Sequence, residues 1–460
     1  MFFKQIKVEG LGCLSYVIGC PLDGRAFVID PKRDVDDYIE IASENNLAIA
    51  GIIETHVHAD HISGAQELHA RTGADIYIHE HAGVAYEHRQ LKNGDTIEIG
   101  NVLLEAVHTP GHTPHAVTLA VTDKSRGDEP EMLLTGDLLF VGSIGRPDLA
   151  GGELLDEQIK NLYQSLHTAL GRFQDLVEIY PAHGEGSLCG SGLSAKPSST
   201  LGYERKNNIY FQLSFDAFRG ELTRTTPFRP KNFSHIISTN KKGARLVSLL
   251  PQPVKLGAAD VIRAVDEGAQ VIDLRDATSF GGAHIPGSIN IGFTPQSATW
   301  MGTVVDPEAS LVLLTGNPQD IGPATALFRK AGYDRITGFV IGLSDWISRG
   351  EETGFLPQLS IHALSRVLEK YDNHHVVDVR RPDEVAAGHI HDAEALPLNE
   401  LIKKGVPHGK DDHISVVCGS GYRSNIAGSL LKSWGYKHVY SVIGGMNAWR
   451  KKYPVITPGQ

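Results

Sequence analysis

Cysteine is scarce in this chain of 460 residues, which has four, at positions 13, 20, 189 and 418. So few cysteines, so widely spaced, do not make the disulfide framework of a small secreted protein, and we expect a reducing, cytoplasmic setting. Long apolar runs are missing too, since none approaches the ~18 residues of a membrane-spanning helix. The start of the chain lacks a basic segment followed by a long apolar core, so we expect no signal peptide.

Positive charge is also in deficit. The chain has 43 lysines and arginines against 54 aspartates and glutamates, and its formal net charge is −11. This balance argues against binding to nucleic acid or to an anionic membrane, because both require an excess of cationic side chains. Local basic pockets for small anions remain compatible with it.

The apolar content is ordinary, at 41%, and a chain of this length suggests about three domains. In the first half, strand-like runs such as 49–55 (IAGIIET) and 101–109 (NVLLEAVHT) alternate with helical spacing such as that of 35–46. This alternation predicts an α/β fold. The polar tract 225–253 is typical of a domain exit and linker.

The second half contains an internal repeat. Residues 271–291 (VIDLRDATSFGGAHIPGSINI) parallel residues 376–396 (VVDVRRPDEVAAGHIHDAEAL). Three pairs lie 105 residues apart: Asp273/Asp378, Arg275/Arg380 and His284/His389. A unit of about 100 residues has the size of a domain and is too long for a solenoid repeat. We therefore expect two copies of one small α/β domain, over residues 254–352 and 357–460.

Potential metal ligands follow four apolar runs in the first half. The stretch ETHVHADHISG, residues 54–64, carries three histidines and one aspartate within six positions, and three later runs each end in one more candidate. The seven candidates are His56, His58, Asp60, His61, His112, Asp137 and His183. Imidazole together with carboxylate suits zinc, iron or manganese. The sequence therefore predicts a metal centre.

This pattern, His-x-His-x-Asp-His with a distal histidine, aspartate and histidine, resembles that of the metallo-β-lactamase superfamily over residues 1–240. The resemblance implies an αββα sandwich with the metal at one edge of its sheets. The internal repeat adds the two small α/β domains after it. The resemblance leaves the reaction open, because hydrolases and oxygenases of the superfamily both retain all seven residues.

A glyoxalase II-type thioester hydrolase is the first kind of enzyme that fits. In such an enzyme two zinc ions would activate a water molecule as the nucleophile. The first ion would be held by His56, His58 and His112 and the second by Asp60, His61 and His183, with Asp137 as the bridge.

A persulfide dioxygenase is the second. One Fe(II) per chain would be held by His56, His112 and Asp137, which leaves coordination positions open for O2 and substrate. The residues that orient the ligands and water would then be His58, Asp60, His61 and His183.

The segment GSIGRPDL, residues 142–149, favours the dioxygenase. It contains Arg146, whose guanidinium is suited to hold a substrate carboxylate. It resembles the arginine segment that helps to seat the substrate in persulfide dioxygenases; the alternative is a surface salt bridge. The helical C-terminal domain of glyoxalase II enzymes is not evident in this chain.

The second copy of the repeat carries a cysteine at the turn from a strand to a helix. The loop CGSGYR comprises Cys418, Gly419, Ser420, Gly421, Tyr422 and Arg423. Backbone N–H groups at such a turn stabilise a thiolate and a bound anion. The loop resembles the six-residue active loop of the rhodanese family. The resemblance implies that Cys418 carries a persulfide and that the loop amides and Arg423 receive thiosulfate or sulfite.

The first copy differs at the same place. At an offset of 103 residues, Thr315 stands for Cys418 and Asp320 for Arg423. An unactivated hydroxyl cannot carry sulfane sulfur, and a carboxylate repels an oxyanion. We therefore expect residues 254–352 to be an inactive rhodanese-like domain, kept for packing or as an interface.

The order of the three domains resembles the persulfide dioxygenase–rhodanese fusion proteins of bacterial sulfide detoxification. The resemblance implies that a small persulfide, carried by glutathione or coenzyme A, is oxidised by O2 to sulfite, which Cys418 then converts to thiosulfate. We also expect a homo-oligomer. The alternatives are a two-zinc hydrolase with a rhodanese appendage and a noncatalytic sulfur carrier or sensor.

Three smaller points stay open. Gly184 and Glu185 follow His183 where glutathione-using persulfide dioxygenases have aspartate and tyrosine, which puts glutathione in doubt as the carrier thiol. Cys189 is either a loop thiol or part of a persulfide relay. Cys20 has no assigned role.

Overall fold

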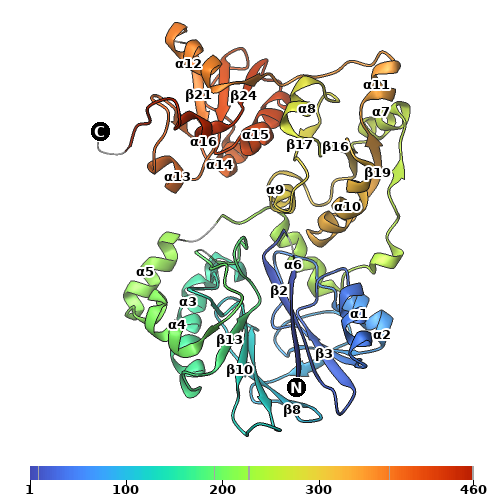
Figure 1. Ribbon diagram of the computed structural model, residues 1–460, viewed down its shortest axis with the longest axis vertical. Coiled ribbons are helices and arrows are strands. Elements are labelled where there is room, and N and C mark those ends of the chain that lie inside the picture. Colours follow the sequence, from blue (N-terminus) through green and yellow to red (C-terminus); the bar gives the residue numbers. More distant parts are fainter. Residues whose placement is uncertain (9, 191, 226–227, 372, 458–460) are drawn as a thin grey trace. The chain divides into compact units, whose positions relative to one another are not determined.

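The computed structural model describes residues 1–460 except 9, 191, 226–227, 372 and 458–460 (Figure 1). The chain divides into two compact units, one of residues 1–250 with 326–332 and the other of residues 251–325 with 333–460. Each is described by itself. Within the described residues, no helix combines the length and the apolar character that crossing a bilayer requires.

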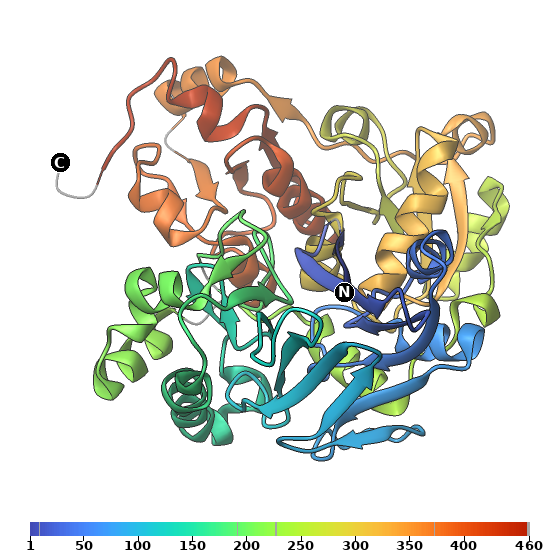
Figure 2. The same ribbon diagram turned by 60° about the horizontal axis from the view of Figure 1, so that its bottom comes forward.

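Two six-stranded sheets form the centre of the first unit (Figures 1 and 2). The first sheet has the order β1-β2-β3-β4-β5-β6 and consists of β1 (Phe2–Val8), β2 (Cys13–Cys20), β3 (Arg25–Ile29), β4 (Ala48–Ile53), β5 (Asp75–His79) and β6 (Arg89–Leu91). The second has the order β14-β13-β10-β9-β8-β7 and consists of β7 (Thr96–Ile99), β8 (Val102–His108), β9 (Val117–Asp123), β10 (Met132–Gly136), β13 (Glu178–Pro181) and β14 (Ser199–Thr200). A short hairpin of β11 (Leu139–Phe140) and β12 (Ser143–Ile144) follows β10.

The main core of this unit lies between the two sheets. Tyr16 and Ile53 from the first sheet pack in one cluster with Leu104 and Leu134 from the second. On the outer face of the first sheet, a separate cluster joins the strands to α1 (Asp36–Glu44) and α2 (Ala65–Thr72). A third joins the outer face of the second sheet to α3 (Leu155–Gln164), α4 (Leu201–Asn207) and α5 (Phe215–Thr225). The predicted αββα sandwich is confirmed.

Burial on both faces explains the near-continuous apolar runs of the central strands. All eight residues of β2 are buried. Alternate side chains point to opposite faces, so Tyr16 and Ile18 reach the core between the sheets while Val17 packs under the helices.

The second unit contains two parallel sheets with one topology. The first, in the order β15-β19-β18-β16-β17, consists of β15 (Val254–Lys255), β16 (Gln270–Asp273), β17 (Ile289–Asn290), β18 (Leu311–Thr315) and β19 (Ile336–Ile341). The second, in the order β20-β24-β23-β21-β22, consists of β20 (Gln358–Leu359), β21 (His374–Asp378), β22 (Glu394–Ala395), β23 (His413–Val417) and β24 (His438–Val442). The two orders match strand by strand, so the sequence repeat corresponds to a repeated fold.

Five helices accompany each copy along the chain. Those of the first copy are α7 (Ala258–Asp266), α8 (Ala277–Gly282), α9 (Ser297–Val304), α10 (Ile321–Lys330) and α11 (Ser344–Ser348). Those of the second are α12 (Ile361–Lys370), α13 (Pro382–Ala386), α14 (Leu398–Lys404), α15 (Tyr422–Ser433) and α16 (Gly445–Trp449).

The repeated Asp–Arg pairs serve as scaffold. The Arg380 guanidinium donates three hydrogen bonds to Asp378 and further bonds to the carbonyls of Glu384 and Gly388. The equivalent Arg275 is bound to its own aspartate in the same way. Each pair therefore ties the end of a strand to the loop that follows.

One part of the linker expectation is wrong. Within the tract 225–253, residues Asn232–Lys242 form the helix α6. Phe233, Ile236 and Asn240 of this helix are buried. Their i, i+3, i+7 spacing is that of an amphipathic helix, and it marks the tract as folded structure despite its polar composition.

A buried polar network joins the two copies. The Asn425 side chain donates to Asn290 Oδ1 at 2.6 Å and accepts from Gln358 Nε2 at 2.8 Å, while the Asn290 N–H donates to Ser429 Oγ at 3.1 Å. Asn425 is wholly buried and Asn290 nearly so. Since α15 begins within the cysteine loop, this network fixes the helix that supports the loop.

We expect Asn425→Ala to lower the free energy of unfolding by about 1–3 kcal/mol, because it leaves buried polar partners unpaired. Urea unfolding of the full chain measures the change. The exposed Asn373 provides the matched control, and Asn373→Ala should unfold as the parent does. Equal stability of the two variants would mean that the network contributes nothing net.

Candidate functional site

The seven predicted ligands lie at the ends of four strands in the first unit. The loop with His56, His58, Asp60 and His61 follows β4, whereas His112 follows β8, Asp137 follows β10 and His183 follows β13. All seven side chains are buried. The sandwich therefore brings together the residues that the sequence disperses over 128 positions.

Three of the seven form an inner group. Asp137 Oδ2 lies 3.2 Å from His112 Nε2 and 3.8 Å from His56 Nε2, and the three atoms fall within 4.8 Å of one another. Each is buried, and none has a hydrogen-bond partner among the described residues. Three unpartnered lone pairs that converge on one point fit a metal ion held by two histidines and one carboxylate.

The other ring atoms orient these ligands. His112 Nδ1 donates to the carbonyl of Arg146 at 2.8 Å, and His56 Nδ1 lies 3.0 Å from Thr55 Oγ1. Such bonds leave Nε2 as the atom that faces the metal. Burial lowers the pKa of both His56 and His112 below the usual value. Both rings are therefore neutral near pH 7, as metal ligands must be.

His58 is not part of the inner group. Its Nε2 lies 3.1 Å from Asp30 Oδ1 and 3.1 Å from Glu54 Oε2. Asp30 adopts a positive φ of 51° and is held there by the N–H and hydroxyl of Thr55. Neither carboxylate was among the predicted site residues, and both lie at strand ends next to the motif.

The remaining ligands form a hydrogen-bonded chain behind the inner group. His183 bridges Asp137 Oδ1, at 2.5 Å from Nδ1, and Asp60 Oδ2, at 2.8 Å from Nε2. His61 Nδ1 lies 3.1 Å from Asp60 Oδ1. Cys13 Sγ lies 3.3 Å from the same carboxylate. Sequence reasoning left Cys13 out because it sits at the start of β2, far from any motif.

Helix α6 closes the back of the motif loop. Asn240 Nδ2 donates to the carbonyls of His58 and His61 at 3.0 and 2.9 Å, and Asn240 Oδ1 accepts from the Ser63 N–H. Helix α6, in the tract expected to be a linker, thus positions the loop that carries His58 and His61.

Arg146 is buried and engaged within the protein. Its Nε and Nη2 donate to Asp148 at 2.7 Å each, and its Nη1 donates to the carbonyls of Leu188 and Phe228. This is a buried ion pair and not the surface salt bridge that was the alternative expectation. A carboxylate substrate would have to replace one of these acceptors, so the predicted role in substrate binding stays a prediction.

Cys189 is next to Arg146, whose backbone N–H donates to the Cys189 carbonyl at 2.9 Å. Its side chain is wholly buried, and burial raises the pKa of its thiol well above the usual value, with Asp60 adding to the effect. A neutral buried thiol is a poor nucleophile. Its sulfur lies within 4.8 Å of ligand atoms of Asp137 and His183, so Cys189 borders the buried His/Asp cluster, and a part in a relay stays a prediction.

The cysteine loop of the second copy has the predicted strand–turn–helix geometry. Cys418 directly follows β23, and α15 begins at Tyr422. The Gly421 N–H donates to Cys418 Sγ at 3.1 Å, and the φ of Gly421 is +109°. Only glycine adopts such a φ readily, so the sequence of the turn allows its N–H to face the sulfur.

Arg423 is held by a carboxylate that the sequence did not indicate. Its Nη1 and Nη2 donate to the two oxygens of Glu384, at 2.7 and 2.6 Å. The paired guanidinium lowers the pKa of Glu384 from 4.5 to about 2. Glu384 thus fixes the orientation of the cation beside the loop.

We expect Glu384→Gln to destabilise the chain at neutral pH and to lose this effect in acid. A carboxyl whose pKa is lowered on folding stabilises the fold above its unfolded pKa, and the stabilisation fades as the pH falls from 4.5 toward 2. Thermal unfolding of parent and variant between pH 7 and pH 3 measures the difference. The exposed Glu369→Gln is the control. A difference that stays constant over this range would contradict the ion-pair explanation.

The first copy has no equivalent cradle at its loop. The Thr315 hydroxyl donates to Asp320 Oδ2 at 3.1 Å, and Asn317 Nδ2 donates to Asp320 Oδ1 at 3.1 Å. The side chains of this loop therefore donate to the Asp320 carboxylate. The second copy has the Cys418 thiol and the Arg423 guanidinium at the corresponding positions.

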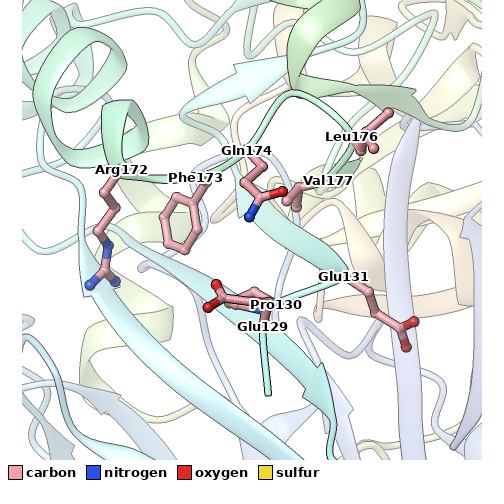
Figure 3. Close-up of a pocket in the computed structure, with 8 residues that line it drawn as sticks. All are labelled: Glu129, Pro130, Glu131, Arg172, Phe173, Gln174, Leu176 and Val177. Carbon is pink, nitrogen blue, oxygen red and sulfur yellow. The ribbon is translucent and has the colours of Figure 1, made fainter. Parts of the chain in front are cut away.

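At least two hollows lie outside these centres. One of about 400 Å³ borders Ser420 and Tyr422 of the cysteine loop, and Asn290 and Phe293 of the first copy form part of its wall. The other, of about 230 Å³, lies near the starts of β10 and β13 (Figure 3). It is lined by Glu129, Pro130, Glu131, Arg172, Phe173, Gln174, Leu176 and Val177. Since β10 and β13 are parallel, this second hollow is at the opposite end of these strands from Asp137 and His183.

Comparisons with known proteins agree with this architecture. The metallo-β-lactamase superfamily matches residues 8–184, and the rhodanese-like domain matches twice, over residues 257–349 and 360–452. The crystal structure of a metallo-β-lactamase from Staphylococcus aureus subsp. aureus COL is similar with a TM-score of 0.66 and 32% identity, over 74% of this chain and 98% of that one.

Two curated relatives match the first part of the chain. The mitochondrial persulfide dioxygenase ETHE1 of Bos taurus is 29% identical over 234 residues, which cover 50% of this chain and 83% of the relative. A hydroxyacylglutathione hydrolase of Polaromonas sp. is 33% identical over 172 residues, which cover 37% of this chain and 61% of the relative. The two relatives correspond to the two kinds of enzyme that the motif allows. The chain belongs to the metallo-β-lactamase superfamily, and its metallo-β-lactamase domain is followed by two rhodanese-like domains.

Proposed function

We propose that the metallo-β-lactamase domain is a non-haem Fe(II) persulfide dioxygenase and that the second rhodanese-like domain is a sulfurtransferase. The observation that carries the proposal is the separation of the seven ligands. The ligand atoms of His56, His112 and Asp137 lie within 4.8 Å of one another, whereas His58 Nε2 lies in a separate group with Asp30 and Glu54, at 3.1 Å from each. A two-zinc hydrolase would need His58 in the same group as His56 and His112.

His56, His112 and Asp137 would hold Fe(II), which would supply the redox chemistry needed for O2 to oxidise the terminal sulfur of a persulfide. The overall reaction is RSSH + O2 + H2O → RSH + SO3²⁻ + 2 H⁺. The protein contributes the hydrogen-bonded chain from Asp137 through His183 to Asp60, which holds protons close to the reacting centre. The burial of all seven residues limits bulk water at the site.

In the second half-reaction the Cys418 thiolate attacks the sulfane sulfur of a second persulfide. The S–S bond of the substrate breaks, RSH leaves, and Cys418 becomes a persulfide. Sulfite then attacks the outer sulfur of the Cys418 persulfide and forms a new S–S bond. The bond between Cys418 Sγ and the outer sulfur breaks, thiosulfate leaves, and the Cys418 thiolate is restored. The Gly421 N–H, at 3.1 Å from Sγ, stabilises the thiolate in both steps.

The fusion supports this assignment over the hydrolase, because sulfite made in the first reaction is consumed in the second. A thioester hydrolase makes no product that a rhodanese-like domain uses. The carrier thiol is coenzyme A or glutathione, and Gly184 and Glu185 after His183 count against glutathione. The expected setting is the cytoplasm.

The proposal is tested by O2 consumption of the chain loaded anaerobically with Fe(II), on addition of glutathione persulfide or coenzyme A persulfide. We expect rapid O2 uptake with sulfite or thiosulfate as the product. If iron-loaded protein takes up no O2 with either persulfide, a dinuclear thioester hydrolase replaces the proposal. Thioester hydrolysis by the zinc-loaded chain would then be measured.

A further inference from the structure

Histidines gather at the edge of the second rhodanese-like sheet from which its strands start. His374, His413 and His438 open β21, β23 and β24, and the strand register pairs His374 with His413 and His413 with His438. The reaction proposed above uses none of them. Cys418 follows the other end of β23, which spans about 17 Å at ~3.3 Å per residue.

A tighter group lies beside this row. His375 is on β21, and His408 and Asp412 are in the turn between α14 and β23. One ligand atom of each side chain lies within 4.8 Å of the others. The rings of His375 and His408 stack, with centroids 4.0 Å apart and planes 16° apart. In the described part of the chain the His375 ring has no hydrogen-bond partner, so its lone pair is available.

Neighbouring groups hold this arrangement in place. The Gly409 N–H donates to Asp412 Oδ2 at 2.7 Å, which closes the turn that carries both His408 and Asp412. Glu394 Oε2 lies 3.0 Å from His408 Nε2. The His408 side chain is 15% exposed and that of Glu394 is 38% exposed. The group is therefore partly shielded and still open to an ion from solvent.

We propose that His375, His408 and Asp412 form a second metal site, for a divalent cation of the zinc class. Two imidazoles with one carboxylate are a common ligand set for Zn²⁺, and Glu394 or a water molecule completes a tetrahedral shell. The site ties the turn 405–412 to β21. Because it is at the far end of β23 from Cys418, its role is to stabilise the domain and not to act on sulfur.

The test is the zinc content of the full chain after saturation with Zn²⁺ and dialysis. We expect His408→Ala and Asp412→Asn each to retain one zinc fewer per chain than the parent. Asp412→Asn keeps an oxygen that accepts from Gly409, so it removes the charge without opening the turn. His413→Ala, on the same edge but outside the group, is the control and should retain the parent content. His112→Ala should lose a different zinc, from the first domain.

A second readout is the unfolding temperature. Added Zn²⁺ should raise it in His112→Ala, where the second site is intact, and in His112→Ala/His413→Ala, but not in His112→Ala/His408→Ala. We also expect zinc affinity at this site to fall at least ~10-fold in Asp412→Asn. Equal zinc content in parent, His408→Ala and Asp412→Asn would overturn the proposal. So would an equal loss in His413→Ala, which would indicate unspecific binding along the histidine edge.

Discussion

The His112→Ala chain is expected to lose its metal on dialysis and to consume O2 at less than about a hundredth of the parent rate. Loss of an outer hydrogen-bonding group already costs up to ~100-fold in affinity or activity, and His112 is one of three groups that face the ion. The variant also removes the ring whose Nε2 lies 3.2 Å from Asp137 Oδ2 and whose Nδ1 donates to the Arg146 carbonyl. Iron content by elemental analysis and O2 uptake with an electrode are measured on the same sample.

The control for this variant is His81→Ala. His81 is exposed and lies outside the inner group, so its removal should leave iron content and O2 uptake unchanged. Undiminished iron and O2 uptake in His112→Ala would remove His112 from the ligands.

The variant His58→Gln distinguishes a mononuclear iron dioxygenase from a dinuclear zinc hydrolase. With a single iron, His58→Gln should keep one metal per chain, because His58 lies against Asp30 and Glu54 and not in the inner group. In a dinuclear zinc site the same change should reduce the metal content from two toward one. The ratio of metal to protein therefore distinguishes the proposal from its alternative without an activity assay.

The Cys418→Ser chain should consume O2 as the parent does but form thiosulfate at less than about a thousandth of the parent rate. Removal of a nucleophile commonly costs this much or more, because a serine hydroxyl cannot hold sulfane sulfur. Sulfite should accumulate in place of thiosulfate, and ion chromatography of the products measures both. Thiosulfate formed at the parent rate would contradict the proposal that Cys418 carries out the second reaction.

The first copy allows a sharper version of this experiment. Adding Thr315→Cys to Cys418→Ser places a thiol at the equivalent turn, yet we expect no recovery. Asp320 faces residue 315 at 3.1 Å and would repel both the thiolate and sulfite. Cys20→Ala, which changes a cysteine on β2 of the other unit, should leave both reactions intact. Recovery of thiosulfate formation in the double variant would show that the first copy is not inactive by its chemistry.

Much of this protein was predictable because its signals are local. Strand-like runs that end in histidine or aspartate and the CGSGYR turn depend on residues close together in the chain. The repeat is visible because two segments 105 residues apart match each other along the sequence. They are sufficient for the αββα sandwich and the two rhodanese-like domains, and they point to the seven histidines and aspartates that the structure brings together. The prediction of a linker over 225–253 was wrong for α6. The average composition of the tract is polar, although Phe233 and Ile236 lie on one buried face of the helix.

The tertiary structure decided how those residues are grouped. His56 and His58 are two positions apart in the sequence, and in an extended strand they would point to the same side. The chain bends at Thr55 and His56, so His56 faces Asp137 whereas His58 faces Asp30 and Glu54. The same holds for partners that come from distant strands. Cys13 reaches Asp60, Glu384 reaches Arg423, and His375 reaches His408 only after the sheets have formed. Spacing along the chain carries no information about such contacts, since they depend on which strands become neighbours.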